Sequence, residues 1–175
     1  MIPDEIVQAT SKEVAAFRGP RARKEMGRLA KRQPELLPFV VVETEDLSPE
    51  AHELAIYLFF VVTRIFEKGG TLSRISGTVI LEQFQDNIDE LERLAAAHDR
   101  FVEKAAAGQA SRQPHVMRYV VESLMETGGG PYPVELTAEE VGTLFLVLKT
   151  VIDVLDDALQ SPDQGAKNRS TRSAR

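Results

Sequence analysis

The pattern of hydrophobic and polar positions predicts helices along the whole chain. The first apolar stripe of helical spacing is closed by Gly19-Pro20 and consists of Ile6, Val7, Val14 and Phe17. Residues 21–31 predict a second, strongly basic helix, which Gly27 weakens. Pro34 suits the first turn of a third helix, whereas Pro38 should bend that helix or delay its start.

Two further segments are apolar on nearly all sides. Ser48-Pro49-Glu50 places an oxygen acceptor at the N-cap, proline at the next position and an acid in the first turn, and opens a helix that should run to Lys68. Thr137-Ala138-Glu139-Glu140 has the form of a capping box and opens the last helix. Because a helix that is apolar all round must be enclosed by other helices, we expect both at the centre of the fold.

Between these two segments the spacing predicts a long amphipathic helix over 76–98 and a shorter one over 99–107. The expected buried face of the long helix consists of Val79, Ile80, Phe84, Ile88, Leu91 and Leu94.

A twelve-residue phrase occurs twice, because Arg32–Glu43 returns as Arg112–Ser123 with the same opening Arg-Gln-Pro. The shift between the copies is 80 residues, and it grows to 89 at the helix starts Leu47–Glu50 and Leu136–Glu139. The added length coincides with the loop composition of Gly128–Pro133. The alternative to duplication is coincidence among similar apolar residues.

The repeat predicts two related helical units whose most apolar helices lie side by side about an approximate two-fold axis. Under the shift of 89 residues, Leu58 matches Val147 and Arg64 corresponds to Asp153. If the two helices cross near the axis, Arg64 and Asp153 could form a salt bridge; otherwise both side chains simply reach solvent.

These patterns predict an all-α protein, a bundle of roughly seven helices with an internal pseudo-two-fold repeat of helical hairpins. We expect a single helical domain over 1–160, with repeat units at about 1–70 and 76–160, and a mobile basic tail over 161–175.

Charge is unevenly distributed over the 175 residues, whose net charge is −6. Residues 1–32 carry +4 and residues 161–175 carry +3, so the body between them is strongly acidic. The absence of cysteine excludes disulfides, thiol nucleophiles and cysteine-based zinc sites. The acidic start of the chain does not resemble a secretory signal, and the apolar run Leu54–Val62 is too short to span a bilayer. We therefore expect a cytoplasmic protein without membrane contact.

The basic segment is the strongest candidate for an anion-binding or partner-binding site. On a helix, Arg21, Lys24 and Arg28 share one face, and Lys31 and Arg32 follow one turn later. Such a stripe can contact phosphates, or it can dock on the acidic body of its own chain or of a second copy. Because no aromatic residues are interleaved to stack on bases, we favour docking on protein.

Other chemistry-bearing residues give weaker patterns. No Glu-x-x-His occurs and no pair of histidines has helical spacing among His52, His98 and His115. Asp86, Asp89 and Glu90 share one helix face and could hold a divalent cation, although a solvated face is the simpler interpretation. We expect no metal or cofactor and assign no catalytic residue.

The sequence thus favours a non-enzymatic helical protein-interaction module that binds another protein or associates with itself. Two other classes stay open. One is nucleic-acid binding through the basic N-terminal segment and the tail. The other is a helical small-ligand or metal-binding sensor or enzyme that uses His98, His115 or the Asp86–Glu90 face.

Overall fold

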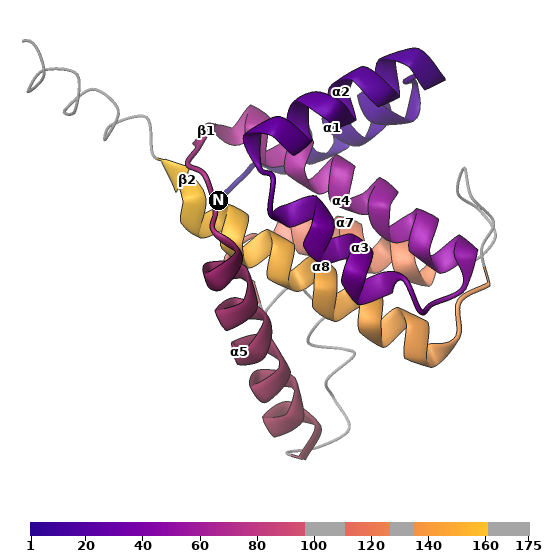
Figure 1. Cartoon of the computed structure of the whole chain (residues 1–175), viewed down its shortest axis with the longest axis vertical. Coiled ribbons are helices and arrows are strands. Elements are labelled where there is room, and N and C mark those ends of the chain that lie inside the picture. Colours follow the sequence, from indigo (N-terminus) through magenta and orange to yellow (C-terminus); the bar gives the residue numbers. More distant parts are fainter. Residues whose placement is uncertain (97–110, 127–134, 161–175) are drawn as a thin grey trace, which may run out of the picture.

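The computed structural model describes residues 1–96, 111–126 and 135–160 (Figure 1). This part of the chain is built almost entirely of helices, which confirms the all-α prediction. The helix expected over 99–107, the loop 128–133, His98 and the tail 161–175 lie outside the described residues.

The described part contains seven helices and two short strands. In chain order they are α1 (Asp4–Ala15), α2 (Gly19–Arg32), α3 (Leu36–Thr44), α4 (Pro49–Gly69), β1 (Thr71–Leu72), α5 (Gly77–Ala96), α7 (Pro114–Met125), α8 (Ala138–Ala158) and β2 (Leu159–Gln160). The three longest helices, α4, α5 and α8, are those that caps and periodicity predict.

Prolines set several helix boundaries. Gly19-Pro20 follows α1 as expected and also begins α2, with proline in its first turn. Pro38 stands at the third position of α3, which begins at Leu36, so the expected delay is observed. Pro114 lies in the first turn of α7, where its missing N–H leaves no helical hydrogen bond unmade.

Helices α4 and α8 pack against each other at the centre, as their apolar sequences predict (Figure 1). In α4 the side chains of Leu58 to Val62 are all buried, and in α8 those of Val147 to Ile152 are buried as well. Burial of the apolar side chains in these two runs is the main source of the fold's stability. Of the buried face expected for α5, Ile80 is buried and Phe84, Ile88 and Leu91 are partly buried. The expectation is wrong at Val79, which is 45% exposed.

One carboxylate joins the starts of α4 and α8. Glu140 accepts a hydrogen bond from the backbone N–H of Thr137 at 2.8 Å, which completes the expected capping box. Its other oxygen accepts from the backbone N–H of Ser48 at 3.1 Å, at the N-cap of α4. These hydrogen bonds, led by those from Ser48, lower the pKa of Glu140 to about 2. The two central helices are therefore parallel, with their N-termini together.

A small ribbon joins the other ends of the same two helices. Thr71 pairs with Gln160 and Leu72 with Leu159 in an antiparallel arrangement, and Ser73 N–H donates to the carbonyl of Ala158 at 3.0 Å. A strand at this place is a correction to the sequence prediction, which was helical throughout. Two-residue strands are too short to show alternation.

The outer helices cover the central pair on both sides. Helix α1 packs against α4 and α7, and α5 packs against α8 and α3. Helix α3 also lies on α4, and α7 on α8. Helix α2 buries only Leu29 and is held mainly by the polar contacts described below. No helix in the described ranges is long and apolar enough to cross a membrane.

Candidate functional site

The five residues of the predicted basic stripe lie on α2. Three of them pair with described carboxylates of the same chain and two do not. Arg21 approaches Glu13 at 3.6 Å and lies over the ring of Phe17, 4.1 Å from its centroid. Arg28 pairs with Glu25 at 2.9 Å.

The remaining stripe residues differ in their partners. Arg32 donates to Glu67 at 3.1 Å. Lys24 and Lys31 are exposed and form no ion pair with another described residue. Three of the five side chains thus face carboxylates of the same chain, and the role of the stripe in binding a partner stays a prediction.

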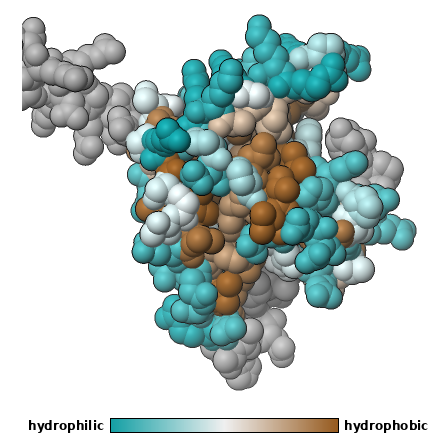
Figure 2. Space-filling model, viewed as in Figure 1, coloured by the Kyte–Doolittle hydropathy of each residue, from teal (hydrophilic) through white to brown (hydrophobic). Residues whose placement is uncertain are grey.

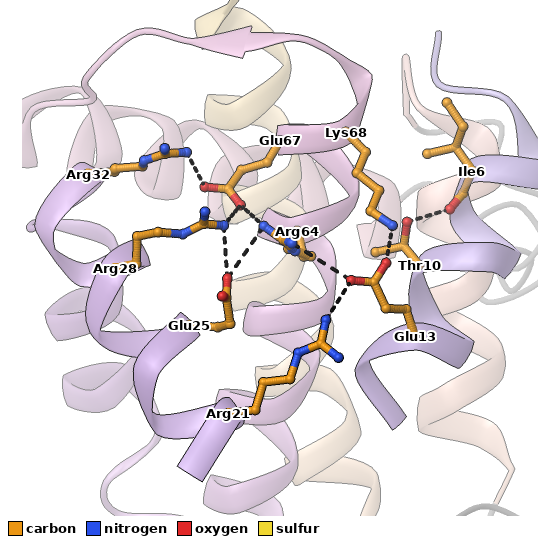
Figure 3. A network of polar contacts seen from close by, with 10 residues as sticks. All are labelled: Ile6, Thr10, Glu13, Arg21, Glu25, Arg28, Arg32, Arg64, Glu67 and Lys68. Carbon is orange, nitrogen blue, oxygen red and sulfur yellow. Dashed lines mark hydrogen bonds and ion pairs between the residues drawn. The ribbon is translucent and has the colours of Figure 1, made fainter. Parts of the chain in front are cut away.

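Arg64 of α4 lies at the centre of this network (Figure 3). Its guanidinium lies 2.9 Å from Glu67 and 3.7 Å from both Glu25 and Glu13. Only 17% of the Arg64 side chain is exposed, and its Nε atom is buried without a hydrogen-bond partner. The network therefore joins α2 to α1 and α4 mainly through charge.

Glu13 occupies the edge of the network. A hydrogen bond from Lys68 lowers the pKa of Glu13, against the opposing effect of burial. Sequence reasoning missed the three glutamates. The available signals were that Glu25 is the single acid inside a basic segment, and that Glu67 follows Arg64 at a spacing of three residues.

The hypothesis of a salt bridge between Arg64 and Asp153 is wrong. Arg64 faces Glu13, Glu25 and Glu67, whereas Asp153 pairs with Lys149 at 2.8 Å. The two side chains point outward from opposite sides of the central helix pair, toward α1 and α2 in one case and α5 in the other.

A second polar cluster is centred on Lys149 of α8, whose side chain is only 6% exposed. Its Nζ donates to Asn87 Oδ1 and to Asp153 Oδ2, each at 2.8 Å, and lies 3.3 Å from Glu90. The Asn87 amide also donates to Thr150 at 3.0 Å. Two hydrogen bonds and a further ion pair therefore engage the buried ammonium group.

Asp153 is the least solvated carboxylate of this cluster. Burial raises its pKa, while the hydrogen bond from Lys149 opposes that effect. A cleft of about 420 Å³ opens beside it, between α5 and α8, and is lined by Asp153, Lys149 and Arg112 together with the polar face of α5.

The acidic face predicted from Asp86, Asp89 and Glu90 borders this cleft, but its members do not converge. Glu90 faces Lys149, Asp89 accepts from Gln85 at 2.9 Å, and Asp86 is exposed. Within the described ranges, no group of three or more potential ligands is placed to hold a metal ion.

The two described histidines lie apart from both clusters. His52 Nδ1 is 2.8 Å from the hydroxyl of Thr44. His115 Nδ1 is 3.0 Å from Arg118 and 3.8 Å from Asp4. Each of the two histidines therefore contacts polar side chains that belong to neither cluster.

No family model, curated protein or solved structure matches the chain. We therefore infer its function from its own side chains.

Proposed function

We propose that the chain is a non-enzymatic helical protein-interaction module that binds its partner through the outer apolar face of α3 and the start of α5. The observation that carries the proposal is the composition of α3, in which seven of the nine residues from Leu36 onward are apolar, including the proline. One side of α3 is buried through Leu36, Phe39 and Val40, yet Val42 remains 58% exposed. Apolar helix faces turned to solvent mark interaction sites.

The neighbouring helix extends this surface. Phe39 of α3 meets Phe84 of α5 edge-on, with ring centroids 5.2 Å apart, so the two helices lie side by side. Leu81, three residues before Phe84 and therefore on the same side of α5, is an exposed apolar side chain. Figure 2 shows hydrophobic side chains gathered on the face that α3 and the upper part of α5 present, with hydrophilic side chains around them.

The charges around this face define the partner. Exposed carboxylates lie next to both ends of α3 and on the first turns of α5, at Glu35, Glu45, Asp46 and Glu82. A second copy would bring these like charges together, which opposes self-association. The occupant we propose is an amphipathic helical segment of another protein, with an apolar stripe flanked by Lys or Arg.

The test uses two labelled amphipathic helical peptides with the same leucine face, one flanked by lysines and the other by glutamates. We expect the lysine-flanked peptide to bind, and its amide chemical-shift changes to map to α3 and α5. Val42→Lys should weaken this binding at least tenfold. Met125→Lys is the matched control, because Met125 of α7 is 57% exposed and lies on another helix.

Three results would overturn the proposal. They are equal binding of both peptides, equal loss of affinity in Val42→Lys and Met125→Lys, or chemical-shift changes that map away from α3 and α5. Light scattering of the free protein adds a fourth: a dimer that Val42→Lys abolishes would assign the face to a second copy.

We also propose that the two halves are related by an approximate two-fold axis, as the repeated phrase predicts. Matching ion pairs support this. Arg32 pairs with Glu67 at 3.1 Å, and its counterpart Arg112 pairs with Asp156 at 3.0 Å. Glu67 and Asp156 are separated by the same shift that aligns the starts of α4 and α8.

The helix packing supports the same relationship, because exchanging α1 with α5, α3 with α7 and α4 with α8 reproduces the pairs of helices in contact. The halves differ in polarity at Phe60 and its counterpart Lys149. Phe60 packs on Phe17, with ring centroids 6.1 Å apart, whereas its counterpart Lys149 pairs with Glu90. The second half thus holds a polar cluster where the first half is apolar.

A further inference from the structure

A hollow of about 510 Å³ lies where the ends of α2 and α4 meet β1. Its charged lining residues are Arg32 of α2, Glu67 of α4 and Arg74, which follows β1, and Gly70 to Leu72 line it as well. This volume falls within the range of small-molecule sites. None of its lining residues belongs to α3 or α5, the two helices on which the proposed function rests.

Gln33 fixes the position of Arg74 at the edge of the hollow. The buried Gln33 amide donates to the carbonyl of Ser73 at 2.8 Å and accepts from the N–H of Ile75 at 3.0 Å. These two bonds lie on either side of Arg74 in the chain. Because Arg32 directly precedes Gln33, the same local geometry holds both arginines at one hollow.

The hollow has more positive charge than its own carboxylate can balance. Glu67 is its single acidic side chain among the lining residues, is only 12% exposed, and is already engaged by Arg28, Arg32 and Arg64. Arg74 is exposed and forms no ion pair with another described residue.

The wider network around Arg64 also has an excess of positive charge (Figure 3). The three carboxylates Glu13, Glu25 and Glu67 face five cationic side chains, Arg21, Arg28, Arg32, Arg64 and Lys68. Arg74 adds a further cation beside Arg32. An anion in the hollow would therefore meet unbalanced positive charge.

We propose that this hollow binds the phosphate group of a small molecule, held by the guanidinium groups of Arg32 and Arg74. Guanidinium groups present paired N–H donors that match phosphate oxygens. A small molecule fits better than a nucleic-acid strand. Arg21 and Arg28, which would have to extend a strand-binding track along α2, do not line the hollow.

The test is calorimetric titration with pyrophosphate at constant ionic strength, with chloride as the balancing anion. Arg74→Gln should weaken pyrophosphate binding at least tenfold, and Arg32→Gln should act in the same direction. Arg23→Gln is the matched control, because Arg23 is an exposed arginine of α2 that does not line the hollow. It should change the affinity less than twofold.

Amide chemical shifts of the wild-type protein provide a readout that needs no variant. Pyrophosphate should shift the amides of residues 70–74, and a titration that shifts none of them overturns the proposal. So does an equal loss of affinity in Arg23→Gln and Arg74→Gln, which would indicate general attraction by charge. A twelve-nucleotide single strand that binds more tightly than pyrophosphate, and loses affinity equally in both variants, would assign α2 to nucleic acid instead.

Discussion

Gln33 and Gln113 make matching contacts in the two halves of the protein. Through Oε1, Gln33 accepts a hydrogen bond from the backbone N–H of Ile75 at 3.0 Å, and Gln113 accepts one from Ile2 at 2.8 Å. Ile75 and Ile2 lie two residues before α5 and α1. Each glutamine therefore connects the start of α3 or α7 to the segment that leads into the outer helix of the other half.

Replacing either glutamine with alanine should destabilise the protein by about 2–3 kcal/mol. The buried backbone N–H that donates to the glutamine, and the acceptor to which the glutamine amide donates, both lose their hydrogen-bond partner. Urea unfolding measures the loss. Gln85→Ala is the control, since Gln85 is exposed on α5, and it should change stability by less than about 0.5 kcal/mol. Losses as small as that control in both variants would contradict this interpretation and weaken the proposed two-fold relationship.

Local sequence signals were sufficient for the central helices. Ser48 and Thr137 act as N-caps through contacts three residues away, and runs that are apolar all round predict burial without further information. The same reasoning could not find that Glu140 bonds to Ser48 or that Lys149 is buried against Asn87. Those contacts join residues 92 and 62 positions apart, and no local pattern indicates them.

The failed pairing of Arg64 with Asp153 has a geometric reason. Under a two-fold axis that runs between two parallel helices, matched positions meet only if they face the axis. Arg64 and Asp153 face away from the proposed axis, so each has partners on an outer helix. The repeat alignment predicted that the two positions are equivalent, but it contained no information about the side of the helix on which they lie.

Glu140 should make stability depend on acid pH. Its pKa is about 2 in the folded protein and about 4.3 in an unfolded chain. The ionised carboxylate therefore contributes its full stabilisation above about pH 4.5, and this contribution is lost as the pH falls toward 2. Glu140→Gln should be less stable than the wild type at pH 6, and the difference should shrink as the pH is lowered.

Urea unfolding at several pH values between 3 and 6 measures this difference. Glu139→Gln is the matched control, because Glu139 is exposed in the same helical turn and should leave the pH profile unchanged. If the difference in the free energy of unfolding between the wild type and Glu140→Gln stays constant across this range, the cap does not act through its charge.

Removal of the Lys149 side-chain charge should destabilise the protein. Lys149→Met leaves the buried carboxylate of Asp153 and the Asn87 carbonyl without their cationic partner, which should cost about 3–5 kcal/mol. The double variant Lys149→Met/Asp153→Asn should recover at least half of the loss, because no uncompensated charge remains. The pKa of Asp153 should rise further in the single variant, since the hydrogen bond from Lys149 lowers it.

Urea unfolding of the single and double variants gives the coupling between Lys149 and Asp153, and carboxyl chemical shifts give the pKa. Additive losses would show that the two side chains do not act as a pair. Lys68→Met is the control, since Lys68 contacts Glu13 at an exposed position and should cost about 0–1 kcal/mol.

Helix α2 should detach from the remaining helices when its ion pairs are weakened, because Leu29 is its only fully buried side chain. Glu67→Gln removes the carboxylate that Arg28, Arg32 and Arg64 share, so three cations are left close together. Amide hydrogen exchange in α2 should accelerate about tenfold, which corresponds to about 1.4 kcal/mol. Exchange in α8 should stay unchanged.

Glu53→Gln is the matched control, because Glu53 is exposed on α4, the helix that also carries Glu67. In the wild type, 1 M salt should accelerate α2 selectively, because screening weakens the exposed pairs. Unchanged α2 exchange under both conditions would mean that Leu29 and its apolar neighbours hold the helix without help from charge.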